Sequence, residues 1–477
     1  MRKHFWRRAA LGLLMSAALA PMAHAGKFHK IKHIVIIYQE NRSFDNLYGT
    51  FPGANGIDQA SAESKTQLDL NGNPYASLAN VPGGFPSDAL LPATVPNGPW
   101  DLGHYAPPRI ATRDISHNHY AMIKQANGGK MNEYSTWSDD PALIMGHYDY
   151  QTLPEAQLAQ EYTLCDNFFQ GAYGASCLNH LYLIGGKDPG SFPVFATVGQ
   201  VSVLTNNPST LQDLIVSPAP DYFLVNSEDP TNPPHGVPPA SGIYVPVLTY
   251  DTIGDRLSEK NVSWKWYAEN WDVVNADPTG AIAGNFDNDH QPFDYFANYA
   301  PGTAARADHL QDVTNFFSDV QNHTLPSVVW IKPYATHDEH PADGVLLDGQ
   351  NYAMSLVNAL WNSSYWQDTL IIITYDESGG WWDHVAPPLA GDGHTLPGQS
   401  DQFGPGPRIP AILAGPFAKQ GYVSHIQFDT TSILRLIESR WHLQPLAIRD
   451  AAANNLALAL DMDGEDFDHE SDDNDQP

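Results

Sequence analysis

The chain has 477 residues, a formal net charge of −30 at pH 7 and a hydrophobic share of 42%. So strong an acidic excess disfavours nucleic acid and anionic membranes as partners, because both carry negative charge themselves. After the N-terminal segment, no stretch reaches the ~20 consecutive apolar residues of a membrane span, which excludes stable membrane insertion of the mature protein.

The first 25 residues are typical of a secretory signal peptide. A basic start, an apolar stretch and an Ala-His-Ala ending predict cleavage after Ala25. Arg7-Arg8 is a feature of twin-arginine export, but its flanks fit that signal poorly, so ordinary secretion is the alternative. Loss of the four basic residues of this segment takes the formal charge from −30 to −34. We therefore expect an exported bacterial protein, periplasmic or secreted.

Short apolar runs alternate with segments of helical pattern along the chain. The runs that predict strands are residues 34–38, 263–267, 327–331, 370–375 and 409–414. The patterns that predict helices are residues 116–127, 153–161, 352–362 and 430–441, the last with Thr430 as its candidate cap. This alternation predicts an α/β fold with a mostly parallel central sheet and helices on both faces.

We expect a single domain over residues 26–460 with two long loop insertions. Segments 55–108 and 206–247 are rich in Pro, Gly, Asn and Ser, and loops of this length often act as lids. If they cover the edge of the sheet, they shape the substrate pocket. Residues 461–477 hold nine acidic residues and no Lys or Arg, which favours a disordered tail over a calcium-binding one.

The first predicted strand runs directly into polar residues. Its apolar run is followed by Glu40 and Asn41, and the late strand ends in the same way at Asp376 and Glu377. Ligands bind at the carboxyl edge of a parallel sheet, and a cation relieves the repulsion of two adjacent acids. Taken alone, the late pair is equally well explained as a solvated acidic turn. If the two strands are neighbours, the four side chains form an oxygen cage that favours Ca²⁺, Mg²⁺ or Mn²⁺ over Zn²⁺.

A glycine-rich segment in the middle of the chain contains a candidate nucleophile. Small residues surround Ser176, and the apolar residues after it have helical spacing. A helix N-terminus favours the negative charge that develops beside an attacking serine. The alternative is a serine that only caps the helix. Because the Gly-x-Ser-x-Gly elbow is absent, we favour activation by a metal over a Ser-His-Asp triad.

The cysteines and histidines leave several roles open. Cys165 and Cys177 either form a disulfide in an oxidising compartment or are two buried thiols. Histidines beside acids in polar loops bind phosphate oxygens, transfer protons or ligate metals, although surface or packing roles are commoner for any one of them. These candidates are His117, His290, His337, His340 and His384, and Lys130 is a candidate fixed positive charge. The His337-Asp-Glu-His340 loop differs from the His-Glu-x-x-His motif of zinc proteases.

Together these segments resemble the bacterial phosphoesterase family that joins acid phosphatases with phospholipases C. The resemblance runs in order from about Lys32 to Trp441. The matching segments are KHIVIIYQENRSFDNLYG, DISHNHYAMIKQANGGKMNEY, LPEAQLAQEYTLCDNFFQGAYGASCLNH, SWKWYAEN, HQPFDYF, DEHP, TLIIITYDESGGWWDHVAPP and GPGPRIPAILAGPFAKQGYVSHIQFDTTSILRLIESRW.

The resemblance implies an alkaline-phosphatase-like fold and phosphate-ester hydrolysis through a phosphorylated residue beside one divalent metal ion. The implied metal ligands are Glu40, Asn41, Ser176, Asp376 and Glu377. The implied catalytic residues are the nucleophile Ser176, the Asn179 that follows it, His117, His290 and His340 around the phosphate, and His384 of the Asp-His-Val turn. Many relatives have Thr-x-Pro-Asn-Arg where this chain has Ser176-Cys-Leu-Asn179-His180, so a phosphate contact at position 180 is not carried over.

The expected function is therefore an exported metal-dependent acid phosphatase acting on small phosphate monoesters, because the serine resembles the acid-phosphatase branch. The alternative is a phospholipase C that hydrolyses the phosphodiester head groups of phospholipids. A third alternative, from another class, is an exported binding protein that has kept the fold without catalysis.

Overall fold

The computed structural model describes residues 27–197, 223–235, 243–277, 286–388 and 403–462. The predicted signal peptide, nearly all of the predicted acidic tail and part of the second insertion lie outside these ranges. Where the chain is described, no helix is both long and apolar enough to cross a lipid bilayer.

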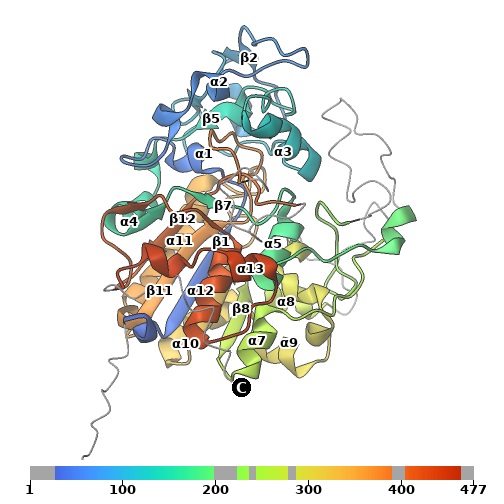
Figure 1. Ribbon diagram of the computed structural model, residues 1–477, viewed down its shortest axis with the longest axis vertical. Coiled ribbons are helices and arrows are strands. Elements are labelled where there is room, and N and C mark those ends of the chain that lie inside the picture. The colour runs from blue at the N-terminus through green and yellow to red at the C-terminus, as the bar shows by residue number, and fades with distance from the viewer. Residues whose placement is uncertain (1–26, 198–222, 236–242, 278–285, 389–402, 463–477) are drawn as a thin grey trace, which may run out of the picture.

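An eight-stranded sheet forms the centre of the molecule (Figure 1). Its strands, in spatial order, are β13 (Tyr422–Ser424), β6 (Thr163–Cys165), β12 (Ala411–Ala414), β11 (Thr369–Tyr375), β1 (His33–Gln39), β10 (Val328–Lys332), β8 (Trp264–Ala268) and β9 (Leu310–Asp312). All neighbours pair in parallel except β12, which is antiparallel to both β11 and β6. The prediction of a mostly parallel α/β sheet is confirmed.

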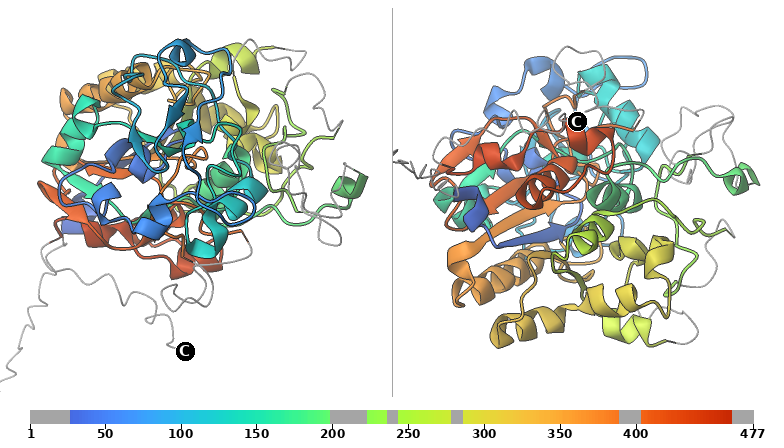
Figure 2. Two further views of the ribbon diagram at one scale, coloured as in Figure 1. Left: turned by 90° about the horizontal axis from the view of Figure 1, so that it is seen from above. Right: turned by 60° about the horizontal axis from the view of Figure 1, so that its bottom comes forward.

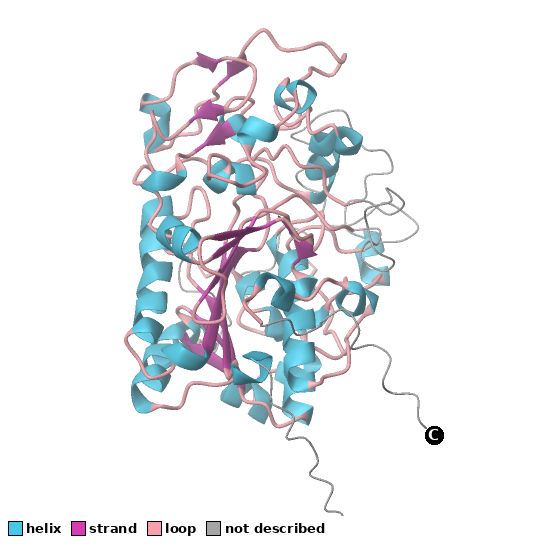
Figure 3. Ribbon diagram, turned by 60° about the vertical axis from the view of Figure 1, so that its left-hand side comes forward, coloured by secondary structure: helices cyan, strands magenta, loops and turns pink. Residues whose placement is uncertain are grey.

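The central strands are buried on both faces, as their continuous apolar sequences require. Every residue of β11, and every residue of β1 after His33, is buried. At the middle of the sheet Ile36 lies between Trp330 of β10 and Ile372 of β11. Helices cover the two faces (Figures 2 and 3). On one face α5 (Ser176–Gly185) packs against α12 (Thr431–Trp441), and α10 (Val313–Asn322) packs against α11 (Leu346–Trp361) on the other.

The remaining elements are short. The helices are α1 (Phe44–Tyr48), α2 (Ala62–Lys65), α3 (His119–Ala126), α4 (Ala156–Glu161), α7 (Ile253–Glu259), α8 (Trp271–Asn275), α9 (Ala304–His309) and α13 (Ile448–Ala452). The strands are β2 (Leu78–Ala79), β3 (Thr94–Val95), β4 (Trp100–Asp101), β5 (Gly146–His147), β7 (Phe168–Phe169) and β14 (Phe428–Asp429). The first insertion contains α2 and β2 to β4, and it lies with α1 and α3 beyond the end of β1 that leads to the site (Figure 1).

All five predicted strands and all four predicted helices are present, with shifted ends. The strand near residue 409 begins only at Ala411, because Pro410 has no N–H to donate to a ladder. The helix near residue 116 begins at His119, because the side chain of Asn118 caps it by accepting from the Ala121 N–H.

The structure also tests the expected cap of α12 and the expected state of the two cysteines. Thr430 occupies the cap position of α12 as expected, but its side chain makes no capping hydrogen bond, and the Asp429 carboxylate accepts from the backbone N–H of Thr431 at 2.7 Å. Cys165 and Cys177 are both buried free thiols, so the disulfide alternative does not apply.

We predict that Ile36→Ala destabilises the fold strongly. Ile36 is fully buried between two strands, and removing its side chain leaves a cavity that costs about 2–5 kcal/mol of unfolding free energy. Ile448→Ala is the matched control, because that side chain is 75% exposed. Urea unfolding of both variants measures the difference. Equal losses in the two variants would contradict the central place of Ile36 in the core.

Candidate active site

Two neighbouring strands deliver acidic residues to the same edge of the sheet. Gln39, the last residue of β1, is in register with Tyr375, the last residue of β11. The next residues, Glu40 and Asp376, therefore leave the sheet side by side. The Asn41 N–H donates to Asp376 Oδ1 at 3.0 Å across the gap. The expectation that the two strands are neighbours is confirmed.

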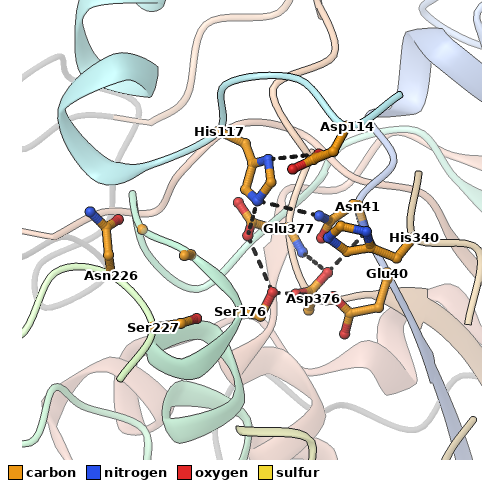
Figure 4. A network of polar contacts seen from close by, with 12 residues as sticks. Glu40, Asn41, Asp114, His117, Ser176, Asn226, Ser227, His340, Asp376 and Glu377 are labelled. Carbon is orange, nitrogen blue, oxygen red and sulfur yellow. Dashed lines mark hydrogen bonds and ion pairs between the residues drawn. The ribbon is translucent and has the colours of Figure 1, made fainter. Parts of the chain in front are cut away.

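The helix α5 brings Ser176 to this edge (Figure 4). Its Oγ donates to Glu40 Oε2 at 3.1 Å and lies 3.4 Å from Glu377 Oε1. Ser176 is the first helical residue rather than the cap, which is Ala175, so the capping alternative is wrong. The serine hydroxyl thus lies between carboxylates that come from the start and the end of the chain.

Asn179 holds the turn that presents the serine. Its side-chain oxygen accepts from the Ala172 N–H at 2.9 Å, and its nitrogen donates to the Gly174 carbonyl at 2.8 Å. The residue is fully buried, and both bonds end on the loop before α5. In this structure Asn179 therefore positions the backbone of the nucleophile loop, and it does not line the cavity in front of Ser176.

The acidic side chains fit a cation. Glu40, Asp376 and Glu377 are fully buried, and among the described residues Asp376 Oδ2 and Glu377 Oε2 have no hydrogen-bond donor. Burial, and after it the charges of Glu40 and Glu377, raise the pKa of Asp376 well above its ordinary value. Burial raises the pKa of Glu377 in the same way, although His117 opposes it. A cation supplies the missing partner for these oxygens.

Asn41 completes the oxygen set. One end of its carboxamide lies 3.1 Å from Glu40 Oε2 and 3.2 Å from Asp376 Oδ1. With nitrogen at this end, the amide donates to both carboxylates and its oxygen accepts from His340 Nε2 at 2.8 Å. With oxygen there, three acceptors face one another, which is the arrangement of a cation cage. The Asn41 side chain thus offers an oxygen ligand where a cation is present.

Three predicted histidines surround this centre. His117 Nδ1 lies 2.6 Å from the Ile115 carbonyl and 3.2 Å from Asp114, while its Nε2 faces Glu377 Oε1 at 3.9 Å (Figure 4). Burial alone would lower the pKa of His117, but Asp114 and Glu377 outweigh it and raise that pKa well above the ordinary value. The ring centroid of His340 lies 5.9 Å from that of His117. His290 Nε2 lies 3.3 Å from Glu40 Oε1.

Two buried residues of the site, Lys332 and His180, are not among the predicted catalytic or metal-binding residues. Lys332 is the last residue of β10. Its ammonium forms a fully buried ion pair with Glu40 Oε1 and lies 3.4 Å from the Tyr38 carbonyl. Burial would raise the pKa of Glu40, but Lys332 and the nearby histidines hold it well below its ordinary value. Burial, with Lys332 adding to it, lowers the pKa of His180 to about 4, so this imidazole is neutral.

A polar cavity of about 440 Å³ opens in front of Ser176. Ile115 and Ala175 are the apolar residues among those that line it, and five aspartates stand in its walls. Asn226 and Ser227 contribute to the wall, so described residues of the second insertion do shape the pocket. No residue of segment 55–108, all of which the structure describes, lines this cavity.

Two predicted site residues lie elsewhere. The side chain of Lys130 is exposed after α3 and does not line the cavity. His384 turns away because its Nδ1 pairs with Asp45 Oδ2 at 2.6 Å. Asp45, Asp383 and His384 have the spacing of metal ligands, but the buried Arg408 guanidinium already lies 3.1 Å from both carboxylates. We therefore assign this cluster a structural role.

Similarity to known proteins identifies this chain as a hydrolase of phosphate esters. The model of the Phosphoesterase family matches residues 31–444, and the chain belongs to this family. It is 26% identical to phospholipase C A of Mycobacterium tuberculosis over 92% of this chain and 78% of that protein. It is also 26% identical to the non-hemolytic phospholipase C of Burkholderia pseudomallei, over 89% of this chain and 57% of that enzyme.

Solved structures are much more distant. A protein of the alkaline phosphatase superfamily from Vibrio parahaemolyticus is 11% identical, with a TM-score of 0.33 over 72% of each chain. A phosphonate monoester hydrolase of Agrobacterium radiobacter gives the same TM-score, 0.33, at 10% identity over 87% of this chain and 74% of that one. Scores this low add nothing to the α/β assignment, which rests on the sheet itself.

We predict that Asp114→Asn lowers the pKa of His117. The Asp114 carboxylate is the strongest of the interactions that raise this pKa, and the amide carries no charge to replace it. Wild-type His117 therefore keeps its proton to higher pH than the variant. An NMR titration of the chelator-treated protein measures both values. Asp343→Asn is the matched control, because Asp343 faces His340 instead, at 3.3 Å; an unchanged His117 titration in Asp114→Asn would contradict the assignment.

Proposed function

We propose that this protein is an exported, metal-dependent acid phosphatase that hydrolyses phosphate monoesters through a phosphoserine at Ser176. The observation that carries the proposal is the position of Ser176 Oγ, within 3.4 Å of buried carboxylates from two strands and at the base of an open polar cavity. The N-terminal sequence supports export, since it has the pattern of a signal peptide.

Ser176 is placed to attack phosphorus in line with the leaving oxygen. Glu40 accepts the hydrogen bond of the hydroxyl and orients it, and the first N–H groups of the ten-residue helix α5 favour the charge that develops there. A divalent ion held by Glu40, Asn41, Asp376 and Glu377, and touched by Ser176, would lower the pKa of the hydroxyl and offset negative charge on the phosphate. Their oxygen donors alone favour Ca²⁺, Mg²⁺ or Mn²⁺.

The histidines around the cavity bind the phosphate and donate the proton to the leaving alcohol. His117, His290 and His340 line the cavity and hold the phosphate oxygens. His117 is suited to give a proton to the leaving alcohol, because its pKa is raised, whereas burial and then Lys332 lower the pKa of His290 well below the ordinary value. The Ser176 hydroxyl loses its proton to water in the open cavity, and the P–O bond to the alcohol breaks as the P–O bond to Ser176 forms. Water then attacks the phosphoserine, releasing phosphate and restoring the hydroxyl.

The cavity favours a small polar substrate over a lipid. Trp381 and Trp382, the two tryptophans that follow the acidic pair, are buried, and the Trp382 indole N–H donates to the Met131 carbonyl at 2.9 Å, so they do not form an apolar rim for a lipid. The alternative is a phospholipase C acting on phosphodiester head groups, and the relatives named above favour it. A non-catalytic binding role is disfavoured, because the serine and its carboxylates are all in place.

We expect Ser176→Ala to reduce turnover of a chromogenic phosphomonoester on the order of 10³-fold or more, because the attacking oxygen is lost. Circular dichroism and thermal melting check that the variant remains folded. Ser355→Ala is the matched control, since that serine is exposed on α11 and bonds only its own helix. Near-normal turnover by Ser176→Ala would refute the nucleophile.

We further expect kcat/KM to be highest for a phosphomonoester when it is compared with a choline phosphodiester and with phosphatidylcholine liposomes. The polar walls of the cavity offer few contacts to acyl chains. The comparison uses mature protein with Ca²⁺, Mg²⁺, Mn²⁺ or Zn²⁺ across pH. Faster turnover of liposomes would establish the phospholipase alternative, and no turnover of any ester would favour the binding role.

A further inference from the structure

The imidazole of His180 is held at the edge of the proposed metal centre. His180 lies one helical turn after Ser176 on α5, so the two side chains share a face of that helix. It is fully buried, and its Nδ1 lies 2.8 Å from the Ser176 carbonyl. A carbonyl oxygen only accepts hydrogen bonds, so Nδ1 carries the proton and Nε2 presents a lone pair.

That lone pair faces other acceptors. Nε2 lies 3.9 Å from Glu40 Oε1, and ligand atoms of Glu40, His180 and Asp376 all lie within 4.8 Å of one another. Among the described residues, neither Nε2 nor Asp376 Oδ2 has a hydrogen-bond donor. The nearby Lys332 ammonium pairs with Glu40 and contacts the Tyr38 carbonyl. A buried lone pair aimed at carboxylates is unfavourable unless a cation lies between them.

The ring is also fixed in place. It meets the ring of Tyr38 edge-on, with centroids 4.9 Å apart, and it stacks on His290 at 5.4 Å with an interplanar angle of 16°. Histidines that bind metals generally donate their other ring N–H to a carbonyl or carboxylate, which sets the tautomer. His180 has this arrangement, with the carbonyl of the nucleophile itself as the acceptor.

We propose that His180 Nε2 is a ligand of the divalent cation held by Glu40 and Asp376. The proposal rests on the metal centre of the proposed function and changes its donor set from oxygen alone to mixed oxygen and nitrogen. Imidazole suits first-row transition metals better than Ca²⁺ or Mg²⁺. The site therefore selects a divalent transition metal of the Mn²⁺-to-Zn²⁺ series over the alkaline-earth ions.

The test measures metal binding and does not depend on turnover. Chelator competition gives the dissociation constants of Zn²⁺ and Ca²⁺ for the wild-type protein, His180→Gln and the matched neighbour variant His290→Gln. We expect His180→Gln to weaken Zn²⁺ binding at least about tenfold more than Ca²⁺ binding, because only the nitrogen ligand is lost. His290→Gln keeps the wild-type ratio of the two constants. Asp376→Asn, which removes a shared carboxylate, loses both ions.

A second measurement needs no stable variant at position 180. Pulsed electron paramagnetic resonance of the Mn²⁺-loaded wild-type protein is expected to show imidazole ¹⁴N coupling, which His290→Gln retains. Bound Mn²⁺ without ¹⁴N coupling, or an unchanged Zn²⁺-to-Ca²⁺ ratio in folded His180→Gln, would overturn the ligand and leave the oxygen cage standing. Failure of the wild-type protein to bind any of the three ions would overturn the metal centre as well.

Discussion

The site depends on the parallel register of β1 and β11. Because Gln39 pairs with Tyr375, Glu40 and Asp376 leave the sheet at the same level and are buried together with Glu377. Burying like charges is costly unless opposite charge is close by. This one pairing therefore creates both the site and its need for positive charge.

The two carboxylate oxygens of Glu40 face different groups of the site. Its Oε1 faces Lys332, His290 and His180, while its Oε2 accepts from Ser176. Lys332 is the last residue of β10, the other neighbour of β1, so each of three adjacent strands has a charged residue at its end or directly after it, at one edge of the sheet. Among the described residues Lys332 forms its ion pair with Glu40 alone, so the buried carboxylates of Asp376 and Glu377 still need positive charge, which a divalent ion would supply.

The sequence was sufficient to predict the strands and the acidic residues, because continuous apolar runs that end abruptly in acids are visible without coordinates. Lys332 ends an apolar run in the same way, and that signal was available. The pairing of His384 with Asp45 was not predictable, because the Arg408 that organises it is distant in the chain. The spacing of four residues on a predicted helix was enough to place His180 on the same face as Ser176. The burial of His180 was not predictable, because it depends on Tyr38 and His290, which only the fold brings together.

The charge distribution along the cavity also bears on the substrate. Its walls hold five aspartates, whereas His117, whose pKa is raised, faces Glu377 close to the serine. Ser176 lies beside the buried carboxylates of Glu40 and Glu377, so a cation held there would make the base of the cavity more positive than its walls. In the proposed mode of binding, a phosphoryl group lies at the base, and a second anionic group farther out would meet the aspartates. We expect such walls to disfavour polyanionic esters, and this expectation suits both a monoester of an uncharged alcohol and a head group that carries positive charge.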